Sequence, residues 1–221
     1  MLEHGDSNGH FGVLEAGDIQ WMTAGRGIIH RDLALRDEYS HIMQLWITLP
    51  AGQKLTEDRY QDLSASARPR VTRPGVVLDV ISGTAEGVTG PALNHVAVQA
   101  VMATLDPSTG FGYTLPADHR AFVHVMSGRA TVADRNLATG ETAWSDPLPG
   151  LTGDSVLPLA TPDGDTRTKI MIYSGAPLGG PISFGGPFVM NHESEIRQAF
   201  ADFHAGKFGE VSRLARLEHD R

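Results

Sequence analysis

The chain has 221 residues, of which 41% are hydrophobic, 20% are charged and none is cysteine. This composition indicates a globular protein and excludes disulfide bonds, iron–sulfur clusters and thiolate zinc sites. The formal net charge is −8, and no run rich in Lys and Arg is present, which argues against direct binding of nucleic acid. No apolar stretch has the length of a transmembrane helix and no signal peptide is visible, so we expect a cytoplasmic protein without membrane contact.

The first third of the chain predicts short β-strands separated by tight turns. Apolar and polar residues alternate in short runs, and Gly and Asp residues mark the turns between them. The predicted strands are 11–14, 19–22, 28–32 and 41–49. The polar segment 59–70 is predicted to be a linker between domains.

A second series of strands follows at intervals of about ten residues, which is typical of β-sandwiches and barrels. These predicted strands are 75–83, 95–105, 121–126, 129–133, 154–159 and 169–174. The tail differs, because Ile196, Phe200 and Phe203 recur at helical spacing and Gly206 follows as a stop signal. We therefore predict an all-β chain with domains at 1–66 and 67–221 and a short helix over about 194–205.

The most informative segment for chemistry is 17–32, which ends in His30-Arg31-Asp32 after a glycine-rich turn. Residues i and i+2 of a strand face the same way, so His30 and Asp32 are predicted to point together. An imidazole and a carboxylate are members of the mixed ligand set that non-haem iron enzymes use. The alternative is that Asp32 only bonds a neighbouring arginine. His4 and His10 are predicted to be solvated turn residues.

Several motifs closely resemble the pirin family. The run GDIQWMTAGRGIIH at 17–30 is long and specific, and it is followed by QLWITLP at 44–50. The far end agrees, with Gly-Pro-Phe-Val-Met-Asn at 186–191 and the helical segment after it. The two signatures stand at opposite ends of the chain in family order, so the resemblance covers essentially the whole sequence.

The resemblance implies two cupin barrels, the N-terminal of which carries a mononuclear metal, usually iron, held by three His and one Glu. His30 matches the third of these His, whereas Asp32 stands where the family has Glu. Asp is shorter by about 1.5 Å, so we expect a backbone shift or a bridging water. The family's early His-x-His strand is absent, which predicts an incomplete, truncated N-terminal barrel. The resemblance also predicts a substrate pocket, and the residues assigned to it are Trp21, His41, Gln44 and Trp46.

The function implied by the resemblance is that of an iron-dependent quercetin 2,3-dioxygenase acting on a flavonol-like aromatic. Other divalent metals also accept His and carboxylate ligands. Two alternatives are a non-catalytic regulator that binds another protein and an inactive relic. An opened barrel exposes an unpaired strand edge, which predicts a dimer formed through the N-terminal barrel.

Overall fold

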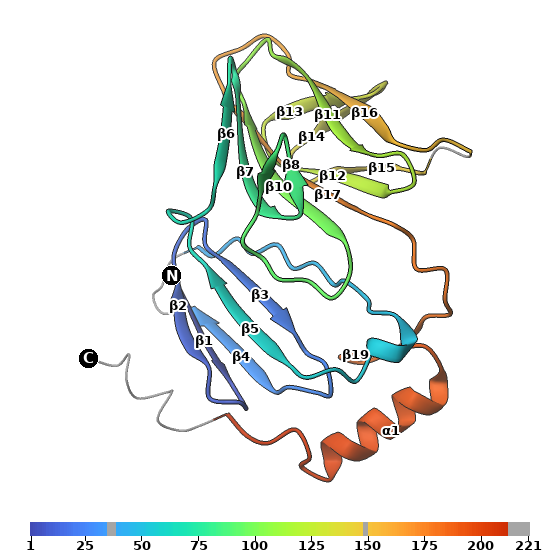
Figure 1. The fold of residues 1–221 in the computed structure, drawn as a ribbon. Coiled ribbons are helices and arrows are strands. Elements are labelled where there is room, and N and C mark those ends of the chain that lie inside the picture. The colour runs from blue at the N-terminus through green and yellow to red at the C-terminus, as the bar shows by residue number, and fades with distance from the viewer. Residues whose placement is uncertain (35–38, 148–149, 212–221) are drawn as a thin grey trace. The chain divides into compact units, whose positions relative to one another are not determined.

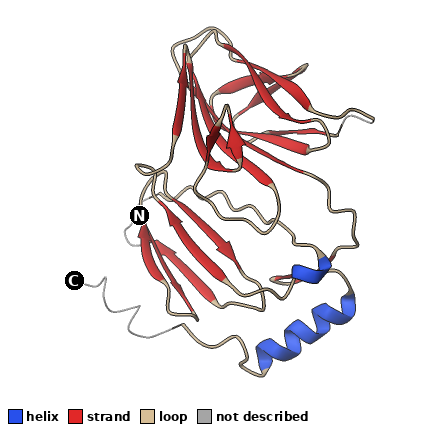
Figure 2. Cartoon of the chain, viewed as in Figure 1, coloured by secondary structure: helices blue, strands red, loops and turns tan. Residues whose placement is uncertain are grey.

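The computed structural model describes residues 1–34, 39–147 and 150–211 (Figure 1). The chain divides into two compact units, one made of residues 1–66 and 178–221 and the other of residues 67–177. Strands dominate both units, and a single α-helix is present in the described residues (Figure 2). No helix in this described part combines the length and the apolar character that crossing a bilayer requires.

The unit 67–177 consists of a six-stranded and a four-stranded antiparallel sheet. The larger sheet has the order β15-β12-β17-β10-β7-β6 and the smaller one the order β11-β16-β13-β14. The strands are β6 (Arg70–Arg73), β7 (Val76–Ser82), β10 (Val98–Leu105), β11 (Gly110–Pro116), β12 (Arg120–Ser127), β13 (Arg129–Val132), β14 (Arg135–Ala138), β15 (Thr142–Ser145), β16 (Asp154–Ala160) and β17 (Thr168–Gly175), with a small hairpin of β8 (Thr84–Ala85) and β9 (Val88–Thr89).

The core of this unit lies between the two sheets. Alternate residues of each strand face inward, as Ile170 and Ile172 do from β17 and Leu157 and Leu159 do from β16. Burial of each such side chain stabilises the fold by about 1.5–3 kcal/mol. The largest buried ring is that of Tyr113, on β11. This apolar filling makes residues 67–177 a self-contained barrel-like cupin unit.

The other unit is built from smaller sheets. β1 (Leu2–Asp6) lies between β2 (Phe11–Leu14) and β4 (His30–Ala34), and all pairings are antiparallel. A second ladder joins β3 (Ile19–Thr23) to β5 (Arg59–Leu63). Among the described residues these sheets do not join into a closed barrel, and β4 is an edge strand. The fold is therefore all-β with one short C-terminal helix, as expected.

The C-terminal segment belongs to this same compact unit, whereas the sequence-based boundary had grouped it with residues 67–177. It contains a hairpin of β18 (Ser183–Gly185) and β19 (Phe188–Met190), followed by α1 (Glu193–His204). The Phe208 ring lies so close to Gly27 that a Cβ atom there would stand 2.4 Å from it. Close packing of this kind explains why the tail groups with the first 66 residues.

Two sequence-based predictions about this unit were wrong. The segment 41–49, predicted to be a strand, has no partner strand in the described part of the chain and forms no ladder. The start of the predicted linker 59–70 is instead β5, which pairs residue by residue with β3. Between them lies a 3₁₀ turn, η1 (Ala51–Gln53).

Candidate metal centre

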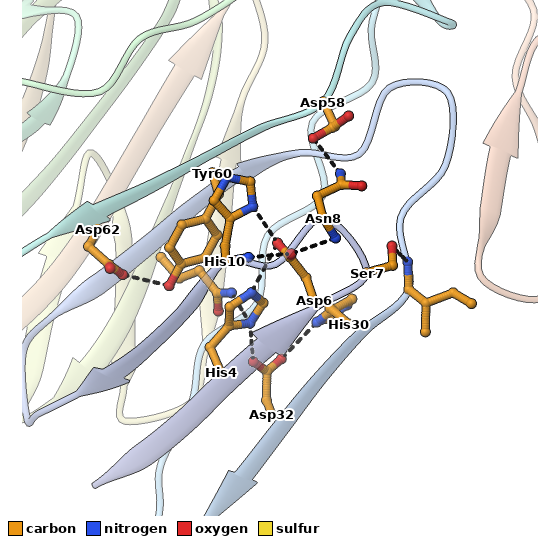
Figure 3. Close-up of polar contacts among 12 residues, drawn as sticks. His4, Asp6, Ser7, Asn8, His10, His30, Asp32, Asp58, Tyr60 and Asp62 are labelled. Atoms are coloured by element: carbon orange, nitrogen blue, oxygen red, sulfur yellow. Dashed lines mark hydrogen bonds and ion pairs between the residues drawn. The ribbon is translucent and has the colours of Figure 1, made fainter. Parts of the chain in front are cut away.

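Two His-x-Asp motifs lie side by side on β1 and β4. The antiparallel register sets His4 directly opposite Asp32, and Asp6 directly opposite His30. Because side chains alternate along a strand, all four project from the same face of the sheet. Each histidine is therefore next to a carboxylate both along its own strand and across the ladder (Figure 3).

The turn between β1 and β2 is closed by Asp6. Its Oδ1 accepts the backbone N–H groups of Asn8 at 3.0 Å and His10 at 2.9 Å. Gly9 adopts a φ of 84°, a left-handed conformation that glycine reaches without steric cost. The Asp-Ser-Asn-Gly sequence thus folds into a side-chain-capped turn that fixes the end of β1.

Strand β5 supplies the cover over this face. The Tyr60 ring stacks on His4, with centroids 4.6 Å apart and planes 11° from parallel. It also stacks on His10 at 5.2 Å, while its hydroxyl donates to Asp62 Oδ1 at 2.6 Å. Gly12 leaves room for this approach, since a Cβ atom there would lie 3.1 Å from Asp62 Oδ2. As a result, His4 is completely buried.

Three donor atoms converge where β1 and β4 meet. His4 Nδ1 lies 2.9 Å from Asp32 Oδ1, and His30 Nδ1 lies 3.1 Å from Asp32 Oδ2. The ligand atoms of these three residues all lie within 4.8 Å of one another. With metal–ligand bonds of about 2.1 Å, neighbouring donor atoms lie roughly 3 Å apart, so the group fits one ion after small adjustments. Two imidazoles and one carboxylate form the donor set typical of non-haem Fe(II).

The electrostatics of the cluster favour a charged carboxylate. Burial alone would raise the pKa of Asp32, but the hydrogen bonds from His30 and His4 outweigh it and lower that pKa well below 3.8. The hydrogen bond to Asp32 raises the pKa of His30 above 6.5, and the Asp32 and Asp6 charges act in the same direction. Burial raises the pKa of Tyr60, and its hydrogen bond to Asp62 adds to this. Asp32 is therefore anionic at neutral pH and able to bind a cation.

The remaining side chains predicted for the site lie elsewhere in the unit. His41, Gln44 and Trp46 are exposed, in a segment without helix or strand, and no hydrogen bond in the described part of the chain joins them to His30 or Asp32. Trp21 lies on β3 beside Gln20, and alternation directs these two side chains to opposite faces. Of the two, it is Gln20 that contacts His4. A substrate pocket lined by Trp21, His41, Gln44 and Trp46 stays a prediction.

The prediction that His4 is a solvated turn residue was wrong. His4 lies in the middle strand of its sheet, and Tyr60 shields it from solvent. His10 does lie at the end of the turn, but its ring bonds Asp6 at 2.9 Å. The missed signal was the repetition of His-x-Asp at 4–6 and 30–32, which the sequence displays but whose pairing depends on a contact between strands 28 residues apart.

The fold and this cluster define a cupin protein with a candidate His and carboxylate metal centre. Comparison with known sequences gives the family. Residues 1–47 match the sequence model of pirin, and residues 100–209 match that of the pirin C-terminal cupin domain. The chain belongs to the pirin family.

Individual relatives agree with this assignment. Pirin-1 of Arabidopsis thaliana is 35% identical over 206 residues, which are 93% of this chain and 71% of that protein. Pirin of Homo sapiens is 34% identical over 212 residues, again covering 71% of the relative. Among solved structures, a quercetin 2,3-dioxygenase from Acinetobacter baumannii superposes with a TM-score of 0.81 at 29% identity, over 96% of this chain and 73% of that one.

Proposed function

We propose that this protein is a metal-dependent oxidoreductase of the quercetin 2,3-dioxygenase type, with iron as its metal and a flavonol-like aromatic as its substrate. The observation that carries the proposal is the convergence of His4, His30 and Asp32, with Nδ1 of each histidine facing the Asp32 carboxylate. The similarity of the chain to the Acinetobacter baumannii quercetin 2,3-dioxygenase supports a dioxygenase reaction.

The residues of the cluster have distinct roles in this proposal. His4 and His30 would bind through Nδ1, the nitrogen that each turns toward Asp32, and Asp32 would contribute the negative charge that balances a divalent ion. When bound, iron supplies the redox chemistry with O2 that such a reaction requires. The side chains of His30 and Asp32 are 31% and 27% exposed, so one side of the centre stays open to a ligand from solvent. Tyr60 keeps water away from the opposite side, over the His4 ring.

Three protein ligands would leave coordination positions open for O2 and substrate. Other divalent metals, the cytoplasmic location and the lack of nucleic-acid binding stay predictions.

The proposal is tested by oxygen uptake. Protein loaded anaerobically with Fe2+ and freed of excess metal is mixed with quercetin and O2, and the depletion of both is followed. His30→Ala and His124→Ala are measured alongside, because His124 bonds Thr142 in the other unit and leaves the cluster intact. We expect coupled consumption in the wild type and His124→Ala and its loss in His30→Ala. Equal rates in all three would attribute the oxidation to free iron and contradict the proposal.

A second candidate is a non-catalytic protein that binds a partner through the open N-terminal unit. Two observations favour it: apolar side chains are exposed, with Trp46 at 53% and Ile42 at 59%, and β4, an edge strand among the described residues, carries Leu33 at 45%. Unpaired strand edges are templates for pairing with another chain, including a second copy of this one. Sedimentation of the pure protein tests the dimer, which the substitution Leu33→Lys is expected to weaken.

A further inference from the structure

Asp6 is a fully buried carboxylate that the proposed ligand set does not use. Its Oδ2 lies 2.9 Å from Nδ1 of His10 and 3.5 Å from Nε2 of His4. Its side chain has no exposed surface. Figure 3 shows Asp6 and Asp32 on opposite sides of the His4 ring. A chain of side chains, His10–Asp6–His4–Asp32–His30, therefore runs through the cluster.

The position of Asp6 does not depend on His4. Its other oxygen accepts the backbone N–H groups of Asn8 and His10. The His10 ring nitrogen Nδ1 lies 2.9 Å from Asp6 Oδ2, so three polar hydrogen-bonding groups surround the two oxygens and stabilise the ionised carboxylate. A carboxylate held by its own turn is a fixed acceptor against which a neighbouring ring can be oriented.

The two nitrogens of His4 meet different surroundings. Nε2 faces Asp6, which as a carboxylate can only accept a proton. Nδ1 faces Asp32, and the Gln20 amide nitrogen also approaches it. In the metal-free chain Nδ1 donates to Asp32, and a metal bound at Nδ1 would replace that proton. The proton that the ring then keeps is the one on Nε2, which faces Asp6.

We propose that Asp6 is a positioning residue for the metal centre. Its carboxylate accepts a hydrogen bond from the Nε2–H group of His4 and thereby directs Nδ1 toward Asp32 and His30. This inference rests on the proposed metal-binding function. Histidine ligands commonly donate their second nitrogen to a carboxylate, which fixes the tautomer and the ring orientation, and loss of that partner weakens metal binding by about 10- to 100-fold.

Asp6→Asn separates this role from closure of the turn. The amide oxygen can still accept from the backbone of Asn8 and His10, whereas the NH2 group that replaces Oδ2 cannot accept from His4. Ser7→Ala is the matched control. It removes the hydrogen bond from the Ile29 backbone to Ser7 Oγ in the same turn and leaves both nitrogens of His4 untouched.

The first readout is metal affinity. Co2+ serves as a spectroscopic substitute for Fe2+, and it is titrated into the chelator-stripped protein in competition with a chelator of known affinity. We expect the Kd to rise about 10- to 100-fold in Asp6→Asn with a changed d–d spectrum, and to stay within about threefold of wild type in Ser7→Ala. A wild-type Kd in Asp6→Asn would overturn the inference.

The second readout needs no metal. Long-range ¹H–¹⁵N spectra of the metal-free protein report which nitrogen of His4 carries a proton and whether that proton is shielded from exchange. We expect a slowly exchanging Nε2–H in the wild type and Ser7→Ala, and its loss in Asp6→Asn. A wild-type His4 without a proton on Nε2 would overturn the inference even if Asp6→Asn failed to fold. If the wild type bound no Co2+, the proposed function would fail, and this spectrum alone would decide the role of Asp6.

Discussion

His4 and Asp32 lie directly opposite each other on β1 and β4, and His4 Nδ1 is 2.9 Å from Asp32 Oδ1. The same ladder pairs Asp6 with His30, so two His-x-Asp motifs meet head to tail. Two of the four groups, His4 and Asp6, are buried, and Tyr60 covers His4, while His30 and Asp32 remain partly open to solvent. This combination gives the centre a fixed inner side and an accessible outer side.

Replacement of His4 by Gln is expected to weaken Co2+ binding by at least about tenfold, because an amide is a poorer ligand than imidazole and the ring can no longer span Asp6 and Asp32. The measurement is chelator competition on chelator-stripped protein. His124→Ala is the control, since that histidine lies on β12 in the other unit. Unchanged affinity in a folded His4→Gln protein would remove His4 from the ligand set.

The coupling between His30 and Asp32 is expected to depend on pH in the metal-free protein. The pKa of His30 is raised above 6.5, so its contribution to stability is complete below that pH and is lost as pH rises through the raised value. The pKa of Asp32 is lowered, so its contribution is present above 3.8 and is lost as pH falls through the lowered value. The free energy of coupling is therefore largest between these two limits.

A double-mutant cycle of His30→Ala and Asp32→Ala, followed by urea unfolding with EDTA present, measures this coupling. Because both side chains are partly exposed, we expect about 1 kcal/mol at about pH 5 and much less at about pH 9. A coupling energy that did not change between these conditions would show that the pair is not charge-assisted.

Docking of the C-terminal segment is expected to depend on Gly27. This residue has a φ of 124°, and a Cβ atom would stand 2.4 Å from the Phe208 ring. Gly27→Ala is therefore expected to cost about 1–3 kcal/mol and to speed proteolysis after residue 190. Gly52→Ala is the control, because a Cβ at Gly52 meets nothing within 4 Å. Equal protease sensitivity in the two variants would argue against this packing.

The barrel core and the metal centre are expected to respond independently to substitution. Ile172 is fully buried in the core of residues 67–177, so Ile172→Ala should lower the free energy of unfolding by about 2–5 kcal/mol. Val156 is 63% exposed, and Val156→Ala should change it by no more than about 0.5 kcal/mol. Co2+ affinity should be the same in both folded variants. A loss of Co2+ binding in folded Ile172→Ala protein would contradict this independence.

Much of the strand pattern could be predicted from the sequence. β10, β12, β16 and β17 lie within a few residues of the predicted segments, because burial on one face imposes strict alternation. The segment 41–49 has the same alternation but no partner in the described residues, and a ladder needs a second strand. β5 was missed because Arg59, Gln61 and Asp62 make three of its five residues polar, so that its composition resembled a linker.

The site could be predicted only in part. Alternation within one strand was enough to place His30 and Asp32 on one face. The contact of His4 with Asp32 depends on which strand pairs with β4 and in which register. Neither can be read from the sequence, because the two residues are 28 positions apart. The role of Asp6 was missed for a related reason. The turn sequence around it predicts that Oδ1 accepts a backbone hydrogen bond, but it does not predict that Oδ2 faces histidine rings.

The most direct test of the central claim is the iron content per chain after anaerobic reconstitution and desalting, measured by mass spectrometry for the wild type, His30→Ala and Asp32→Ala. Asp134→Ala serves as the control, because that carboxylate is exposed in the other unit. The account predicts close to one iron per chain in the wild type and Asp134→Ala, and little in the other two. The same trace of iron in all four proteins would contradict it.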